Sequence, residues 1–160
     1  FNDLEKASKI VNEASSNNKK IIIVGNGGSA AISSHVAVDF TKAAGIRAIN
    51  FNEADLITCF ANDYGYENWV SEALKSYADF GDVIVLISSS GESMNIINAA
   101  NTARDMKNKI LTFSGFSSSN PLRSLGDVNF WIDSRSYNYI EMTHHIWLVA
   151  ICDYIISVKS

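Results

Sequence analysis

Two segments rich in glycine and serine each follow a short apolar run. We call them the glycine turn (25–29, Gly-Asn-Gly-Gly-Ser) and the serine turn (88–93, Ser-Ser-Ser-Gly-Glu-Ser). A strand that ends in small residues and leads into a helix leaves backbone N–H groups unpaired at the helix N-terminus, where the peptide dipoles favour negative charge. Serine hydroxyls add further donors. The two turns therefore predict an anion site, although glycine-rich turns also form for conformational reasons alone.

The runs before these turns belong to an alternation of short β-rich segments and longer amphipathic ones. We expect strands at 20–24, 47–51, 82–87, 109–114 and 128–132, and helices at 3–14, 29–44, 68–78, 93–106 and 139–158. Strands that are apolar throughout and separated by helices favour a parallel sheet covered on both faces. The predicted fold class is therefore α/β, a three-layer αβα fold with a five-stranded parallel sheet, doubly wound in the flavodoxin-like or Rossmann-like manner.

Length and composition indicate one domain over residues 1–160. The chain has 160 residues, of which 47% are hydrophobic, so it can bury a sizeable core. It contains no linker, repeat or low-complexity stretch. Because it does not begin with Met, we expect that its N-terminal helix is truncated.

Net charge limits the partners that the chain would attract, and its cysteine content indicates the cellular compartment. A net charge of -4, without a cluster of Lys or Arg, gives no general attraction for nucleic acid or anionic membrane. No secretory signal or membrane-length apolar run is found. Cys59 and Cys152 are too few for a disulfide framework, so we expect buried free thiols in the reducing cytoplasm.

Ligands of doubly wound sheets bind beyond the carboxyl ends of the strands, where the strand order reverses, so both turns are expected to face one crevice. The glycine turn also fits the dinucleotide fingerprint through Gly25, Gly27 and Ala30. That fingerprint requires an acidic residue at the end of the second strand. Asn52 stands near that point and Glu53 follows, so a nucleotide-dependent oxidoreductase stays open as an alternative with weaker support.

Four motifs in this order resemble the phosphoheptose isomerase branch of the sugar isomerase (SIS) family. They are the glycine turn with His35 shortly after it, 61–67 (Ala-Asn-Asp-Tyr-Gly-Tyr-Glu), the serine turn, and the start of the last helix at 139–141 (Tyr-Ile-Glu). The resemblance implies a homotetramer with sites between subunits. It also implies conversion of sedoheptulose 7-phosphate to D-glycero-D-manno-heptose 7-phosphate, for lipopolysaccharide or capsule synthesis.

The same resemblance implies which residues hold the phosphorylated sugar. The phosphate would be bound by Ser88, Ser90 and Ser93, with Asn26 and Ser29 in the same pocket. The full set of predicted substrate contacts is Asn26, Gly27, Ser29, Ser88, Ser89, Ser90, Ser93 and Glu141.

The reaction requires a base that moves a proton between adjacent carbons and an acid that transfers protons to and from the oxygens. The resemblance implies a divalent metal, often zinc, where the carbonyl would be polarised. Its ligands would come from the helix after the glycine turn and from the last helix. His35 and Asp39 are four residues apart and share a helix face, as do Glu141 and His145. We expect these four side chains to hold the metal, since mixed nitrogen and oxygen ligands suit zinc.

Three of these positions depart from the family's pattern. Asp39 stands where the family has a glutamate that is ligand and base, Glu141 where it has a glutamine, and Val149 where it has a second catalytic histidine. We hypothesise that His145, one turn earlier on the same face, has taken over that role, so that Asp39 and His145 form the acid/base pair. Asp63 matches a family acidic residue near the reacting carbons and is the third predicted catalytic residue, although Asn-Asp-Tyr-Gly is also a good turn sequence.

A sugar-phosphate isomerase accounts for most of these motifs. Val149 supports an alternative in which His144 and His145 are core or interface residues. The chain would then be a non-catalytic SIS module that binds a sugar phosphate or a protein.

Overall fold

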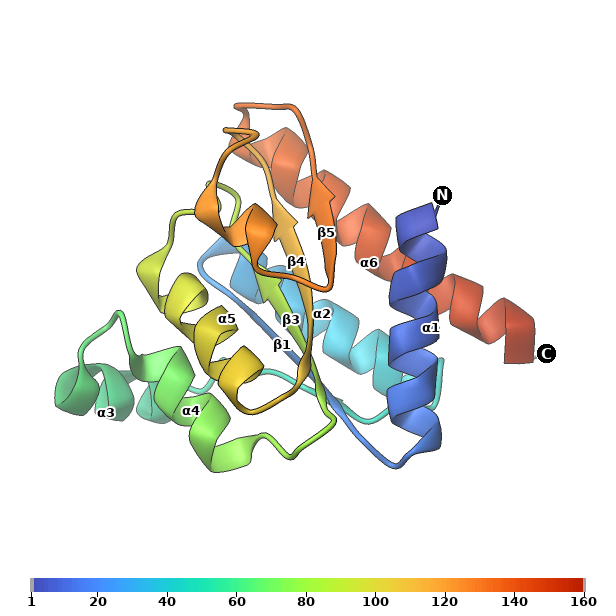
Figure 1. The fold of residues 1–160 in the computed structure, drawn as a ribbon, viewed down its shortest axis with the longest axis horizontal. Helices are drawn as coiled ribbons and strands as arrows, with labels where there is room; N and C mark the ends of the chain where they lie inside the picture. Colours follow the sequence, from blue (N-terminus) through green and yellow to red (C-terminus); the bar gives the residue numbers. More distant parts are fainter. Residues whose placement is uncertain (1, 160) are drawn as a thin grey trace.

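Five parallel strands form one sheet in the order β2-β1-β3-β4-β5. Figure 1 shows four of them, β1, β3, β4 and β5, side by side. The computed structural model describes residues 2–159. The strands are β1 (Ile21–Gly25), β2 (Ala48–Ile49), β3 (Val83–Ile87), β4 (Lys109–Ser114) and β5 (Val128–Trp131). The order reverses between β1 and β3, which makes their carboxyl ends the expected ligand position in a flavodoxin-like sheet. The predicted fold class is confirmed.

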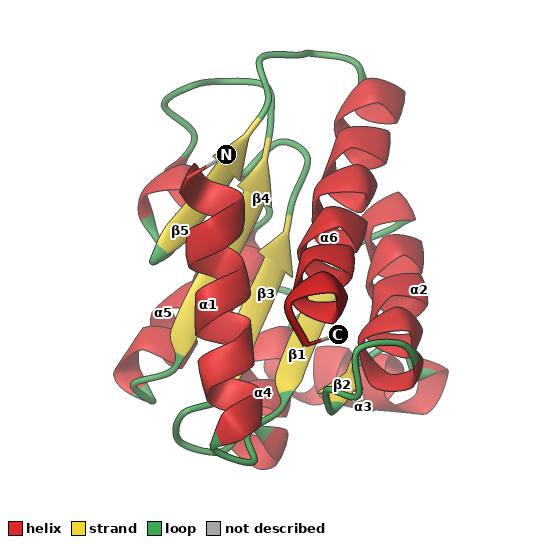
Figure 2. Ribbon diagram, turned by 90° about the vertical axis from the view of Figure 1, so that its right-hand side faces the viewer, coloured by secondary structure: helices red, strands yellow, loops and turns green. Residues whose placement is uncertain are grey.

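Helices cover both faces of the sheet, as Figure 2 shows. They are α1 (Asn2–Ser16), α2 (Gly28–Lys42), α3 (Ala54–Tyr64), α4 (Trp69–Tyr77), α5 (Met94–Asp105), the 3-10 helix η1 (Pro121–Ser124) and α6 (Tyr137–Lys159). Buried side chains of α1, α2 and α6 pack on one face of the sheet, and those of α4 and α5 pack on the other.

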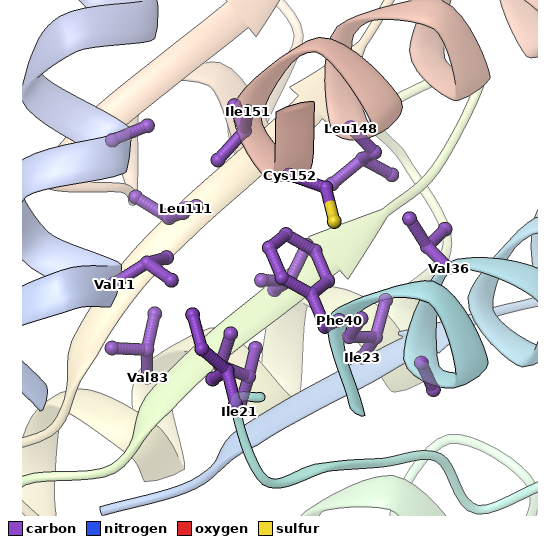
Figure 3. Close-up of a cluster of buried hydrophobic side chains, with 14 of the residues drawn as sticks. Val11, Ile21, Ile23, Val36, Phe40, Val83, Leu111, Leu148, Ile151 and Cys152 are labelled. Atoms are coloured by element: carbon purple, nitrogen blue, oxygen red, sulfur yellow. The ribbon is translucent and has the colours of Figure 1, made fainter. Parts of the chain in front are cut away.

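Strand β1 supplies side chains to both cores because successive residues of a strand point to opposite faces. Ile21 and Ile23 belong to the core under α1, α2 and α6, whereas Ile22 and Val24 belong to the core under α4 and α5. Figure 3 shows the first of these cores, where Phe40 of α2 lies between the sheet and α6. Burial on both sides explains why β1 and β3 read as continuous apolar runs.

A buried charge cluster joins the beginnings of β1 and β3. Asp82 is fully buried, and its Oδ1 accepts a hydrogen bond from the backbone N of Lys20 at 2.9 Å. Its Oδ2 lies 2.6 Å from the Nζ of Lys20, which is also 2.7 Å from Asp79. Burial acts to lower the pKa of Lys20, but hydrogen bonds and charge from Asp79 and Asp82 outweigh it and raise that pKa. The charged lysine is therefore the stabilised form.

The second strand is shorter than predicted. We expected a strand at 47–51, but β2 contains only two residues. Asn50 accepts a hydrogen bond from the backbone N of Asn52 at 2.9 Å, and Asn52 donates to the carbonyl of Ala30 at 2.6 Å. These side-chain contacts replace ladder hydrogen bonds and turn the chain away from the sheet.

Helix α3 was not predicted from the sequence. It has no buried residue and lies at the periphery of the molecule (Figure 1). This helix ends with Asn-Asp-Tyr, from the sequence that also suits a turn, and Gly65 follows the helix with φ 84°. The prediction of a buried Cys59 was wrong for the same reason: Cys59 lies on α3 and is exposed, whereas Cys152 is buried as expected. Among residues 2–159, none of the helices has the length and apolarity needed to span a membrane.

Candidate functional site

The glycine turn connects β1 to α2 and brings the N-terminus of α2 to the sheet edge. Gly27 has φ 56°, a conformation that favours glycine. A Cβ at Gly28 would collide with the carboxylate of Glu141, which comes from α6. The missing side chain therefore lets a carboxylate lie over the N-terminus of α2, where the helix dipole stabilises negative charge.

The serine turn connects β3 to α5 and is supported from behind by the segment after β4. The backbone N of Gly115 donates to the carbonyl of Ser89 at 2.8 Å. Gly91 has φ 69°, and a Cβ there would collide with the side chain of Asn120. Asn120 is buried and donates to the carbonyl of Gly115 at 3.2 Å. These contacts hold the serine turn in one conformation.

Both turns open into one cavity of about 110 Å³, which we call the serine cavity. Its lining residues are Asn26, Ser29, Ile87, Ser88, Ser89, Ser90, Ser93, Tyr137 and Glu141. Of the predicted substrate contacts, only Gly27 is outside this lining. Pockets for whole ligands commonly measure about 300–1,000 Å³, so the serine cavity suits one group of the size of a phosphate.

A larger hollow of about 590 Å³ lies beside α3. Its lining is mainly apolar, as with Phe51 and Leu56, and it includes the carboxylates of Glu53 and Asp55. This hollow has no serine in its lining, whereas five serines line the serine cavity and offer hydroxyl donors, so the serine cavity is the better candidate for the site predicted from the two turns.

Tyr137 lines the serine cavity but was not predicted from the sequence. It is the first residue of α6, four positions before Glu141, so the two side chains share one helix face. Its ring packs against Phe116, with ring centroids 4.9 Å apart. The i, i+4 spacing from Glu141 was a usable signal, but we expected the helix to begin at 139.

One helical turn after Glu141, His145 faces His35 and Asp39 of α2. We call these three residues the histidine cluster. Nε2 of His35 lies 3.2 Å from Oδ2 of Asp39, and the ring centroids of His35 and His145 are 4.7 Å apart. Nε2 of His145 is buried and has no hydrogen-bond partner within the described residues. Burial and the charge of His35 lower the pKa of His145, and the charge of Asp39 opposes this. The imidazole of His145 is therefore neutral at neutral pH.

His144 lies in the core and not in the histidine cluster. Its side chain is fully buried, with Nε2 3.1 Å from the carbonyl of Ser114 and the ring against Phe113 and Trp147. Burial lowers the pKa of His144 to about 4, against the weaker opposite effect of the Ser114 carbonyl. Of the two adjacent histidines, only His145 is therefore placed next to His35.

Asp63 does not reach the serine cavity. It is exposed near the end of α3, where its carboxylate accepts a hydrogen bond from Asn62 at 2.9 Å and lies 3.9 Å from the sulfur of Cys59. The contacts within this chain give no support to its predicted catalytic role.

The predicted metal ligands do not come together as a set of four. Glu141 lies in the serine cavity, one turn away from the histidine cluster. Over residues 2–159, no group of three or more His, Cys, Asp and Glu side chains is arranged to hold a metal ion. The donors as they stand do not fit zinc.

The sequence matches a known protein family and its curated members. A family model described as SIS domain matches residues 1–115. The chain is 35% identical over 158 residues to a phosphoheptose isomerase of Aliarcobacter butzleri, which covers 95% of this chain and 83% of the relative.

Solved structures share the whole fold. The structure of phosphoheptose isomerase GmhA from Neisseria gonorrhoeae matches with a TM-score of 0.91 and 28% identity, over 98% of this chain and 86% of that one. A phosphoheptose isomerase from Francisella tularensis matches with a TM-score of 0.89 over 97% of this chain and 84% of that one. At 24% identity, this second likeness shows the fold alone.

Proposed function

The chain belongs to the SIS domain family, in its phosphoheptose isomerase branch, and we propose that it isomerises sedoheptulose 7-phosphate to D-glycero-D-manno-heptose 7-phosphate. One observation carries this proposal: the two predicted anion-binding turns open into a single serine cavity, one turn of α6 away from paired imidazole and carboxylate groups. The four-residue step from Glu141 to His145 corresponds to about 6 Å along the helix axis, at about 1.5 Å per residue. The carbon atoms between the phosphate and the carbonyl of an open-chain sugar span such a distance.

The serine cavity supplies the donors for the phosphate. Ser88, Ser90 and Ser93 present hydroxyl groups, and Ser93 also precedes α5, whose N-terminus favours an anion. Ser93 makes no side-chain hydrogen bond to its own helix. Its hydroxyl instead accepts a hydrogen bond from Ser88 at 3.1 Å, so both hydroxyls are held at the cavity.

The histidine cluster supplies the proton transfers. We assign Asp39 as the base that takes a proton from C1 of the ketose and returns it to C2. His145 gives a proton to the C2 oxygen to form an enediol and then accepts the proton of the C1 hydroxyl, which leaves an aldehyde at C1. A neutral imidazole paired with a carboxylate base suits this chemistry, and burial keeps His145 neutral.

Several apolar side chains beside the histidine cluster support a homo-oligomer. Val38 on α2, and Met142 and Ile146 on α6, are all more than half exposed. Exposed apolar groups on neighbouring helices favour association, and we propose the homotetramer expected from the resemblance, with the histidine cluster at a subunit interface. Light scattering of wild type and an Ile146→Asp variant tests this, with a smaller assembly expected for the variant.

Zinc, a cytoplasmic location and a role in heptose synthesis for lipopolysaccharide or capsule stay as separate proposals. Calorimetric titration of zinc into wild type and into a His35→Ala variant tests the first. Zinc binding that depends on His35 would mean that the histidine cluster rearranges around the ion.

Product formation from sedoheptulose 7-phosphate by the purified protein tests the proposed function. We expect turnover with this substrate, and a Ser93→Ala variant should raise KM several-fold, because it removes one hydroxyl from the phosphate. A protein that binds the sugar phosphate without turnover would instead be the non-catalytic module that Val149 suggests.

A further inference from the structure

Asn26 enters the serine cavity from the glycine turn, and its side-chain amide is held by two residues that do not line that cavity. Asn95, near the start of α5, forms a reciprocal pair with it. Nδ2 of Asn26 donates to Oδ1 of Asn95 at 3.0 Å, and Nδ2 of Asn95 donates to Oδ1 of Asn26 at 2.9 Å. The hydroxyl of Tyr66 donates to the same Oδ1 of Asn26 at 3.1 Å.

These contacts leave the Asn26 amide with one free hydrogen-bonding group. A primary amide has two donor hydrogens and an oxygen with two lone pairs. Both acceptor positions on Oδ1 are taken, by Asn95 and Tyr66, and one hydrogen on Nδ2 is taken by Asn95. What remains is one N–H, so Asn26 can donate to a ligand oxygen but has no lone pair left to accept from a ligand hydroxyl.

The two holding residues differ in environment. Asn95 is 2% exposed, so its amide has to find partners inside the protein. Tyr66 is 56% exposed and reaches Asn26 from the segment after α3. A second asparagine of α5, Asn98, donates to the carbonyl of Glu67 at 2.9 Å and keeps that segment against α5. The glycine turn, α5 and the segment at 66–67 are thus joined through side chains.

We propose that Asn95 and Tyr66 are positioning residues, which fix the Asn26 amide so that its one free N–H points at a phosphate oxygen of the substrate. This inference rests on the proposed function for the identity of the ligand. It does not require turnover, because inorganic phosphate presents the same oxygens. Asn26 is the group that touches the ligand, and Asn95 and Tyr66 act only through it.

A double-mutant cycle measures this dependence. The probes are inorganic phosphate and sedoheptulose 7-phosphate, with Kd measured by calorimetry for wild type, Asn26→Ala, Tyr66→Phe, Asn95→Ala and the two double variants that contain Asn26→Ala. We expect Tyr66→Phe and Asn95→Ala each to weaken binding of both probes about 3- to 10-fold, as for loss of one hydrogen bond. Each double variant should bind as Asn26→Ala alone does. Losses that multiply in the double variants would overturn the proposal.

Two controls keep the result interpretable. Tyr64→Phe removes a hydroxyl from a similarly exposed tyrosine that does not contact Asn26, and it should leave Kd unchanged. Because Asn95 is buried, its variant is checked by circular dichroism. If it does not fold, the cycle with the exposed Tyr66 decides alone.

We call the hydrogen bonds that Asn26 makes with Asn95 and Tyr66 the network. The network and the proposed function are tested by different outcomes. A wild type that binds phosphate with the expected non-additivity but does not isomerise the sugar would contradict the function and support the network. A wild type that isomerises the sugar, with Tyr66→Phe equal to it in Kd, would contradict the network and support the function.

Discussion

His145 of α6 lies edge-on to His35 of α2, with ring centroids 4.7 Å apart and ring planes at 76°. Val149, one turn further along α6, stands where the resemblance places a catalytic histidine. The contact with His35 therefore shows an imidazole on the same face of α6, displaced by one turn. It also separates His145 from its neighbour His144, whose ring is in the core.

Replacing His145 by Ala should abolish most of the turnover. The change removes the group assigned to the substrate oxygens, so we expect kcat to fall at least 100-fold, in line with the usual size of general acid/base catalysis, with KM changed less than 3-fold. Steady-state kinetics measure both values. The matched control is Thr143→Ala, on the same helix, which should leave kcat unchanged. Full activity of His145→Ala would refute the assignment.

Replacing Glu141 by Gln should tighten phosphate binding. The Glu141 carboxylate lines the serine cavity together with the residues assigned to the phosphate, and like charges at close range repel each other. We expect Kd for inorganic phosphate to fall about 5-fold, equivalent to about 1 kcal/mol. Ser90→Ala is the contrasting variant and should weaken binding. An unchanged Kd for Glu141→Gln would mean that the bound phosphate lies away from this carboxylate.

His144 should make the protein less stable in mild acid. Its pKa is about 4 in the folded protein and about 6.5 when unfolded, so the unfolded chain binds more protons between these values. The contribution of His144 is therefore complete above pH 6.5 and is lost as the pH falls towards 4. Between pH 7 and pH 5 the loss amounts to about 2 kcal/mol.

Urea unfolding of wild type and His144→Gln at pH 7 and pH 5 checks this linkage. Other groups titrate in both proteins, so the quantity of interest is the difference between their pH dependences. We expect wild type to lose about 2 kcal/mol more than the variant over this interval. Equal losses would show that protonation of His144 does not lower the free energy of unfolding.

The buried charge cluster predicts a large loss of stability for Asp82→Asn. The change removes the buried carboxylate nearest to the Lys20 ammonium group and leaves only the exposed Asp79 as its partner. Breaking a buried ion pair costs about 3–5 kcal/mol, and because Asp79 remains we expect a loss at the lower end of this range. Glu13→Gln is the control, since Glu13 and Lys9 form an exposed pair worth less than about 1 kcal/mol. Chemical denaturation compares the two. Similar small losses would contradict the view that Lys20 and Asp82 stabilise each other.

The sheet and the two turns that follow β1 and β3 were predictable because their signals are local. Five buried residues in β1 and in β3 gave continuous apolar runs, and the small residues after them marked the turns. Helix α3 was missed because it has no buried face, and its last residues resemble a turn. When a helix is exposed and held by only a few partly buried contacts, the periodic spacing of apolar residues in its sequence is weak.

The site was predictable in its chemistry more than in its pairings. The predicted serines and Glu141 line one cavity, since both turns lie at carboxyl ends of neighbouring strands. The choice between His144 and His145 depends on how α6 packs on the sheet, which spacing alone does not determine. The pairing of Asn26 with Asn95 and Tyr66 depends in the same way on contacts between segments 40 and 69 residues apart.

Deuterium incorporation from the solvent distinguishes proton transfer by Asp39 from binding of the sugar phosphate alone. Wild type and the variants Asp39→Asn and Asp39→Glu are incubated with sedoheptulose 7-phosphate in deuterated water, and NMR follows the first two carbons of the sugar. We expect heptose 7-phosphate with deuterium at C2 for wild type, no deuterated product for Asp39→Asn, and partial recovery for Asp39→Glu. Binding of the sugar phosphate by wild type, with neither product nor deuterium incorporation, would contradict the proposed function.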